Sequence, residues 1–363
     1  MSPTWARCLV VFVVTLALIF LLSRLATRIG LVDYPGRRKR HRGDVPLIGG
    51  PAIFLGVCLG AYLLPLDLHF YIPLLASLGV LLAAGLLDDL RDLTPWQKLT
   101  AQLIAATLIV SWGKVVVTNL GDLTGFGPLT LLRWGLPFTI VALIGLINAI
   151  NMADGADGLA AGFATIALTF LAMSAFIADR VVTAHFLLIV IIAVLAFLAL
   201  NMRSPWLPRA RIFLGDSGSM MLGLLLTWFS VEVSLGAGGL APMVAVWFLA
   251  VPLLDMGVVI LRRIGKGQSP FRAGRDHFHH VLIATGMPPG TAVLLIHAVA
   301  LALATAGFVA WRLGVSDYWM FYAFIALFAG SYALSWRWRQ MIRRVHRWKR
   351  SAMARSSDKV GSS

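Results

Sequence analysis

Three short motifs in this 363-residue chain combine acidic residues in a pattern that could hold a metal ion beside phosphate groups. They are Asp88-Asp89-Leu90-Arg91-Asp92, the segment from Asn148 to Gly158 with Asn151, Asp154 and Asp157, and Gly215-Asp216-Ser217-Gly218-Ser219. Adjacent carboxylates resist ionising together unless a cation or hydrogen-bond donors compensate their charge. Mg²⁺ would do so, because proteins usually hold it by one or two carboxylates together with substrate phosphates. The motifs therefore predict Mg²⁺-assisted phosphate chemistry.

Two of the three motifs also have a purely structural interpretation. Asp88 and Asp89 could form a solvated helix cap, and Asp216 could be no more than the N-cap of a helix. Free amides and small residues at a helix start also make a phosphate cradle, however. The Asp154 and Asp157 pair is harder to explain structurally, because its glycines let the backbone approach a ligand and its asparagines could bind a polar ring.

A histidine cluster follows later, in Arg272-Ala273-Gly274-Arg275-Asp276-His277-Phe278-His279-His280. No cysteine accompanies it, and carboxylate sites prefer harder metals than zinc. Arginine and imidazole N–H groups suit a pyrophosphate. The alternative is a solvated basic loop that touches lipid headgroups.

Asp255 is an isolated acid within an apolar segment. An acid at membrane depth is a functional candidate by default. Asp255 could support the site from behind, or it could form a structural hydrogen bond to a neighbouring helix.

The elements that position these residues are apolar helices, since 59% of the residues are hydrophobic and 13% are charged. A bilayer core of about 30 Å needs roughly 20 apolar residues per helix. Hydropathy with Pro, Gly and charge breaks predicts an all-α polytopic membrane protein of about eleven transmembrane helices. They cover residues 5–27, 48–65, 71–87, 97–116, 134–150, 158–178, 183–201, 214–232, 240–261, 291–312 and 318–336.

The basic residues predict the orientation. The C-terminal tail is strongly basic, so the positive-inside rule places it in the cytoplasm and the N-terminus outside. On this topology all three acidic motifs and the histidine loop face the cytoplasm, and five basic residues remain outside: Arg7, Lys114, Arg133, Arg180 and Arg312. We expect one integral membrane domain over residues 1–350 and a disordered basic cytoplasmic tail over 351–363.

Composition disfavours several other functions. Cys8 and Cys58 lie in apolar runs, so neither a disulfide framework nor a thiolate metal site is expected. The net charge of +15 sits beside membrane spans, where it signals topology and binds anionic headgroups rather than nucleic acid. A secondary transporter would place its acids near mid-bilayer. An intramembrane prenyltransferase would need a second acidic motif, which the sequence lacks.

Taken together, the motifs resemble those of the polyprenyl-phosphate N-acetylhexosamine-1-phosphate transferases. The resemblance spans residues 30 to 280 and includes the first loop, with Gly30-Leu31-Val32-Asp33-Tyr34-Pro35, Arg38-Lys39-Arg40-His41 and Gly49-Gly50. It implies an eleven-helix fold in the bacterial inner membrane and Mg²⁺ dependence, with Mn²⁺ as a substitute. The implied substrates are a UDP-HexNAc donor and undecaprenyl phosphate, within membrane lipid, and a homodimer is one option for assembly. The branch that makes undecaprenyl-diphosphate-GlcNAc looks closest, while the branch that takes UDP-MurNAc-pentapeptide and donors such as UDP-GalNAc stay as alternatives.

The resemblance also implies roles for individual residues. Asp88, Asp89, Asp154, Asp157 and Asp216 would be catalytic, and Asp216, Asp88 and Asp89 would bind the metal. Asp88 or Asp89 could instead receive a proton from the acceptor. Substrate binding would involve Asn148, Asn151, Arg275, His277, His279, His280, Lys39 and His41.

Overall fold

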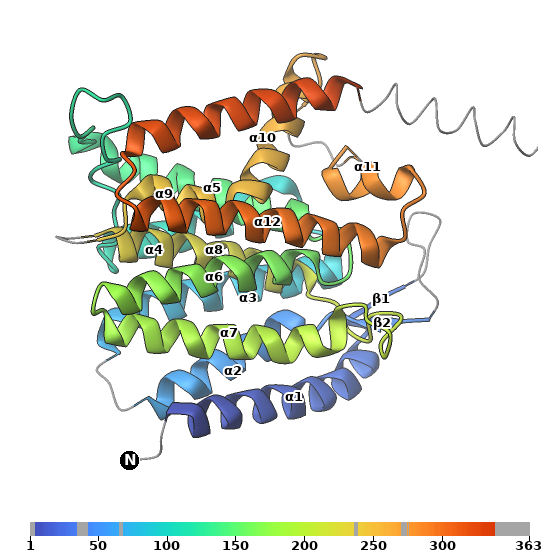
Figure 1. The fold of residues 1–363 in the computed structure, drawn as a ribbon. Coiled ribbons are helices and arrows are strands. Elements are labelled where there is room, and N and C mark those ends of the chain that lie inside the picture. The colour runs from blue at the N-terminus through green and yellow to red at the C-terminus, as the bar shows by residue number, and fades with distance from the viewer. Residues whose placement is uncertain are drawn as a thin grey trace, which may run out of the picture.

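The computed structural model describes residues 4–34, 43–64, 68–235, 239–269, 274 and 276–337, and it is a bundle of long helices (Figure 1). The helices are α1 (Thr4–Ile29), α2 (Gly49–Leu63), α3 (Ile72–Arg91), α4 (Pro95–Ser111), α5 (Gly135–Ala153), α6 (Leu159–Ile177), α7 (Val181–Asn201), α8 (Gly215–Ser234), α9 (Pro242–Phe248), α10 (Ala250–Ile264), α11 (Phe278–Ala284) and α12 (Pro289–Arg312). A last helix covers Asp317–Arg337, and single 3-10 turns lie at His69–Tyr71 and Leu132–Trp134. Two short strands, β1 (Val32–Asp33) and β2 (Val45–Pro46), pair antiparallel.

Apart from the segment 240–261, the described helices match the predicted apolar segments, and an all-α membrane protein is confirmed. Among the described residues, seven helices are long and apolar enough to cross a membrane, or eight if α9 and α10 form one bent span. Of the remaining predicted segments, α2 and α4 are shorter, with 15 and 17 residues, and α8 carries Asp216 and Glu232. The number of crossings and their direction therefore stay predictions.

The structure adds two features that hydropathy did not predict. The segment predicted as one helix over 240–261 is broken at Leu249, where α9 and α10 meet at 82°. The histidine loop contains a short helix, α11, which begins directly after His277. The break precedes α10, which leads into the connection that carries the histidine cluster, and α11 lies within that connection.

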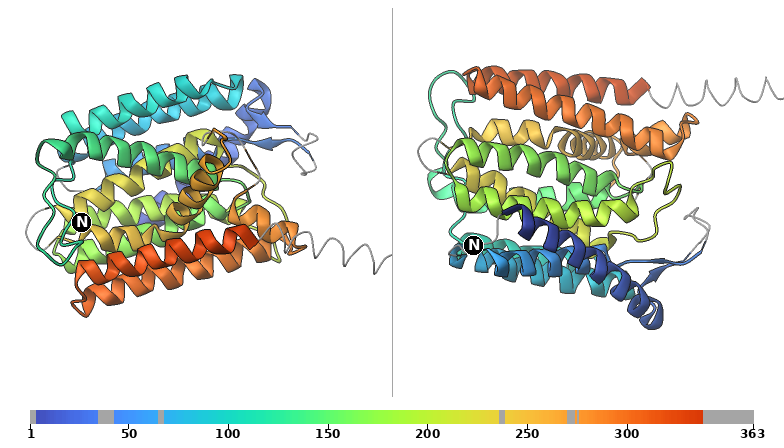
Figure 2. Two further views of the ribbon diagram at one scale, coloured as in Figure 1. Left: turned by 90° about the horizontal axis from the view of Figure 1, so that it is seen from above. Right: turned by 60° about the horizontal axis from the view of Figure 1, so that its bottom comes forward.

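Helix α8 lies inside the bundle, where it packs against α2, α3, α5 and α6 (Figure 2). The approach of α3 is close because Gly85 has no side chain: a Cβ there would lie 2.2 Å from Cα of Ser217. Such a distance is far below van der Waals contact, so the glycine is required for this packing. It brings the C-terminal end of α3 against the N-terminal end of α8, where two of the acidic motifs lie.

The helix ends that carry these motifs lie at the same end of the bundle. In Figure 1, β1, β2 and α11 gather at the end opposite the N-terminus. The loop before α2 contacts the start of α8, since the amide of Gly49 donates to the carbonyl of Phe213 at 3.0 Å and Leu47 forms a β-bridge with Phe213. The first loop and the Gly-Asp-Ser-Gly-Ser motif therefore meet at this end.

The other end of the bundle is held by a buried carboxylate. Glu232 near the end of α8 accepts hydrogen bonds from Tyr71 Oη at 2.7 Å, Thr183 Oγ1 at 2.6 Å and Trp228 Nε1 at 2.8 Å. A buried carboxylate is tolerated only where its acceptors are satisfied in this way. The network ties the starts of α3 and α7 to the end of α8.

Candidate active site

The centre of the site is a lysine that joins two of the acidic motifs. Lys98, in the first turns of α4, forms ion pairs with Asp88 at the end of α3 and with Asp216 at the start of α8, the latter at 2.8 Å. Thr94 and Gln97 form a capping box that fixes the start of α4 just before Lys98. The backbone amide of Leu93 donates to the other oxygen of Asp88 at 2.7 Å. Both oxygens of Asp88 are thus engaged.

Asp88 pairs with a side-chain cation, whereas Asp89 binds the Gly-Asp-Ser-Gly-Ser motif. Asp89 accepts the backbone N–H of Asp216 at 3.0 Å and lies 3.5 Å from Ser217 Oγ. Gly215 has a φ of +74°, and a Cβ there would lie 2.6 Å from Asp89 Oδ2. Glycine is needed at this position both for the left-handed backbone and for the close carboxylate.

The two asparagines of the second motif differ in their partners. Asn151 donates to Asp216 Oδ1 at 3.0 Å and to Ser219 Oγ at 2.9 Å, so it links α5 to the start of α8. Asn148 instead donates to Gln102 Oε1 at 2.8 Å, between α5 and α4. Asn151 therefore belongs to the acidic cluster, whereas the contact of Asn148 lies one helical turn away.

Asp154 follows the end of α5 and interacts with carboxylates of all three motifs. Burial, and then the charges of Asp216, Asp89 and Asp157, raise its pKa from 3.8 to about 8. Burial is the main cause of this shift, and the three neighbouring carboxylates add to it. A cation in this region would relieve it.

Asp157 is held by an arginine that the sequence motifs did not single out. Arg203 Nε donates to Asp157 Oδ2 at 2.7 Å from the loop after α7. Two residues earlier, Asn201 accepts the backbone N–H of Gly158 at 2.7 Å and donates to the carbonyl of Ile212 at 2.8 Å. The end of α7 thus positions the turn that carries Asp157 and connects it to the approach to α8.

The three histidines form a row across the site. The ring centroids of His277 and His279 are 6.0 Å apart, and those of His279 and His280 are 4.1 Å apart. His279 is only 2% exposed, and a Cβ on Gly155 would lie 2.3 Å from its Nε2. The row therefore packs directly against the turn that carries Asp154 and Asp157.

The environment of His279 keeps its ring neutral. Burial, and then the neighbouring His280 and His277, lower its pKa from 6.5 to about 3. Within the described part of the chain, its Nε2 has no hydrogen-bond partner. His279 thus presents one uncharged, unpaired ring nitrogen to the Gly155 turn.

The carboxylates suit a hard cation, but not a closed protein cage. Among the described residues, no three His, Cys, Asp or Glu side chains converge in a ready-made metal site. The ammonium of Lys98 already compensates Asp88 and Asp216, while Asp154 is buried beside three further carboxylates that raise its pKa. This donor set fits an Mg²⁺ ion held by one or two carboxylates and completed by substrate oxygens.

The structure thus brings together most of the predicted site residues. Asp88, Asp89, Asp154, Asp157, Asp216 and Asn151 are linked by these contacts and charges, and His277, His279 and His280 lie beside them. Lys39, His41 and Arg275 lie outside the described residues. Lys98 and Arg203 are further residues of the site, and in the sequence both are single basic residues near predicted helix ends with no motif around them.

Fold and site together define an integral membrane protein of helices with a carboxylate-rich site at one end of its bundle. A sequence profile for Glycosyl transferase family 4 matches residues 71–234, which include the three acidic motifs. The chain belongs to this family.

Several relatives of the chain share one name. An undecaprenyl-phosphate alpha-N-acetylglucosaminyl 1-phosphate transferase of Haemophilus influenzae is 39% identical over 90% of this chain and 93% of the relative. The proteins of the same name from Pasteurella multocida and Escherichia coli K12 are 37% and 32% identical. They cover 89% and 93% of this chain, and 92% and 93% of the relatives are matched.

Proposed function

We propose that the chain transfers GlcNAc-1-phosphate from UDP-GlcNAc to undecaprenyl phosphate, forming undecaprenyl-diphosphate-GlcNAc and UMP. The relatives named above carry this acceptor and this sugar in their names. The observation that supports the proposal most is the joining of Asp88 and Asp216 by Lys98, within reach of the charge of Asp154. Such a site can bring together two phosphate-bearing molecules.

The first task of the reaction is to suppress repulsion between two anions. Lys98 contributes a fixed positive charge, and the histidine row contributes imidazole groups for the diphosphate. The acceptor phosphate attacks the phosphorus that bears the sugar, in line with the departing UMP. The last proton of the acceptor phosphate titrates near pH 6, by analogy with phosphorylated side chains, so much of the acceptor is already a dianion at pH 7.

A general base is therefore not required, and the contacts of Asp88 fit this view. Its oxygens are engaged by Lys98 and by the amide of Leu93. Asp88→Asn should lose activity without recovering it at high pH, whereas recovery at high pH would assign Asp88 the role of a base.

Mg²⁺ is the cofactor we propose, with Mn²⁺ as a substitute. Asp216, Asp88 and Asp89 would hold it, and when bound it would supply neutralisation of the diphosphate charge. Asn151 keeps Asp216 oriented through its amide. Asp154 and Asp157 would position nucleotide and sugar, with Arg203 orienting Asp157.

For the membrane arrangement we propose eleven crossings in the bacterial inner membrane, with the site facing the cytoplasm. The basic tail and the basic loops on the side of the site support this orientation. A homodimer is compatible with the proposal.

The test is a reconstitution. Purified protein is incubated with undecaprenyl phosphate, Mg²⁺ and labelled UDP-GlcNAc, and lipid product and UMP are measured. A panel with UDP-GalNAc and UDP-MurNAc-pentapeptide identifies the donor, and Asp216→Asn is the inactive control. Absence of a lipid product with every UDP-HexNAc donor would refute the proposed function.

A further inference from the structure

We infer that Asp255 is a positioning residue that orients His277 and the start of α11, and through them the histidine row of the site. This inference rests on the proposed function. Asp255 lies on α10, far in sequence from the three acidic motifs. It nevertheless contacts the middle of the segment that carries the three histidines.

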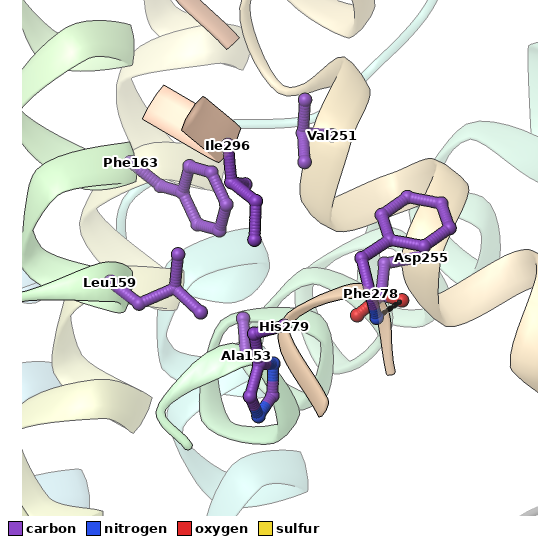
Figure 3. Close-up of a pocket in the computed structure, with 8 residues that line it drawn as sticks. All are labelled: Ala153, Leu159, Phe163, Val251, Asp255, Phe278, His279 and Ile296. Atoms are coloured by element: carbon purple, nitrogen blue, oxygen red, sulfur yellow. Dashed lines mark hydrogen bonds between the residues drawn. The ribbon is translucent and has the colours of Figure 1, made fainter. Parts of the chain in front are cut away.

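Two hydrogen bonds define the interaction. His277 Nδ1 lies 2.8 Å from Asp255 Oδ2, and the backbone N–H of Phe278 donates to Asp255 Oδ1 at 2.9 Å. Figure 3 shows the second bond, with Asp255 reaching the backbone nitrogen of Phe278 beside an otherwise largely apolar cavity. Asp255 is 7% exposed and His277 4% exposed, so both groups are shielded from solvent. One carboxylate thus fixes the backbone that opens α11 and the ring just before it.

The chemistry of a carboxylate determines what this contact does to the ring. An ionised carboxylate can only accept hydrogen bonds, so the shared proton lies on Nδ1 of His277. The position of the other ring nitrogen is then set, as in other carboxylate–histidine pairs. Because His277, His279 and His280 follow one another ring to ring, fixing the first ring constrains the row that packs on Gly155.

Other residues of α10 hold the same segment from the same side. Arg262 donates to Asp276 Oδ1 at 3.3 Å, and a Cβ on Gly274 would lie 2.7 Å from Arg263 Nη2. Arg262 lies seven residues after Asp255, about two helical turns along the same face. α10 turns away from α9 by 82°, which places this face against the histidine segment instead of along the bundle.

The inference can be tested by a double-mutant cycle on kcat/KM for UDP-GlcNAc. Asp255→Ala removes both acceptors, and Asp255→Asn keeps an acceptor for the Phe278 amide but lacks the second acceptor for His277 Nδ1. We expect each to lower kcat/KM by about 10- to 100-fold, as is typical for groups that orient a functional histidine. His277→Gln should cause a similar loss, and adding either Asp255 change to it should cause little more.

Asp179→Asn is the matched control, because Asp179 is exposed on the loop before α7 and its left-handed backbone suits asparagine. It should keep wild-type activity. Three results would overturn the inference: effects that multiply in the double variants, wild-type activity of both single Asp255 variants, or aggregation of both single Asp255 variants. An inactive wild-type protein would instead refute the proposed function.

Discussion

Lys98 Nζ lies 2.8 Å from Asp216 Oδ2, although the two residues are 118 positions apart in the chain. The same ammonium pairs with Asp88, so one cation compensates the ends of two helices. Its position is fixed by the capping box at the start of α4. Any substrate or metal that binds these carboxylates must share them with Lys98.

Removal of this charge should separate metal binding from catalysis. In Lys98→Met, Asp88 and Asp216 lose their shared cation, so Mg²⁺ should bind more tightly, with half-maximal activity at an at least about tenfold lower concentration. The fixed positive charge is lost from the reaction, and kcat should fall by about 100-fold or more. Mg²⁺ titrations of initial rate measure both values. Lys114→Met, on a loop remote from the site, should change neither, and an unchanged Mg²⁺ requirement in Lys98→Met would contradict the shared-cation interpretation.

Gly155 should not tolerate even one methyl group. A Cβ there would lie 2.3 Å from His279 Nε2, so Gly155→Ala should displace the histidine row or the Asp154 turn and reduce activity at least about 100-fold. Gly145→Ala is the matched control, because nothing lies within 4 Å of its Cβ position. Both variants, solubilised in detergent, should elute from a size-exclusion column at the same volume as the wild-type protein. Full activity of Gly155→Ala would show that the row is free to move.

The neutral state of His279 predicts how stability depends on acid. Its folded pKa of about 3 lies below the usual 6.5, so the stabilisation is complete above about pH 6.5 and is lost as the pH falls toward 3. The loss should approach about 1.4 kcal/mol per pH unit in that window. His279→Gln removes this contribution. Thermal unfolding midpoints from pH 7 to 4.5 should therefore fall more steeply for wild type than for the variant, and parallel curves would contradict the assignment.

Asp154 predicts a dependence of the opposite sign. Its folded pKa of about 8 lies above 3.8, so protein without a divalent cation should lose stability as the pH rises from about 4 through 8. Mg²⁺ near these carboxylates should favour the ionised form. The gain in unfolding midpoint on adding Mg²⁺ should therefore be larger at about pH 8.5 than at about pH 5.5, two values that lie on either side of the folded pKa. In Asp154→Asn this difference should shrink, and an equal gain at both pH values would argue against a cation beside Asp154.

Much of this architecture could be predicted from the sequence because apolar length and motif order are local signals. The helices and the meeting of the acidic motifs followed from them. The break at Leu249 was not predicted, because mean hydropathy is high on both sides of it and residues 240–261 were therefore assigned to one helix. Pro252 lies in the first turn of α10 and has no N–H to donate to the carbonyl of Phe248, so a continuous helix would lose a hydrogen bond at this place.

The partners of the site residues were equally hidden. Lys98 and Arg203 are ordinary basic residues near span ends, and only the fold brings them to Asp88 and Asp157. Asn148 shows the converse, because a motif asparagine turned out to pair with Gln102 between two helices. Asp255 was recognised as unusual, but its contact with His277 depends on the turn between α9 and α10.

The buried Glu232 network at the opposite end has a mechanical consequence. Tyr71, Thr183 and Trp228 anchor α3, α7 and α8 there through one carboxylate. The same three helices carry Asp88, Arg203 and Asp216 at or just beyond their other ends. These hydrogen bonds cross-link the starts of α3 and α7 to the end of α8, so any relative displacement of the three helices at that end would leave a buried carboxylate without its donors.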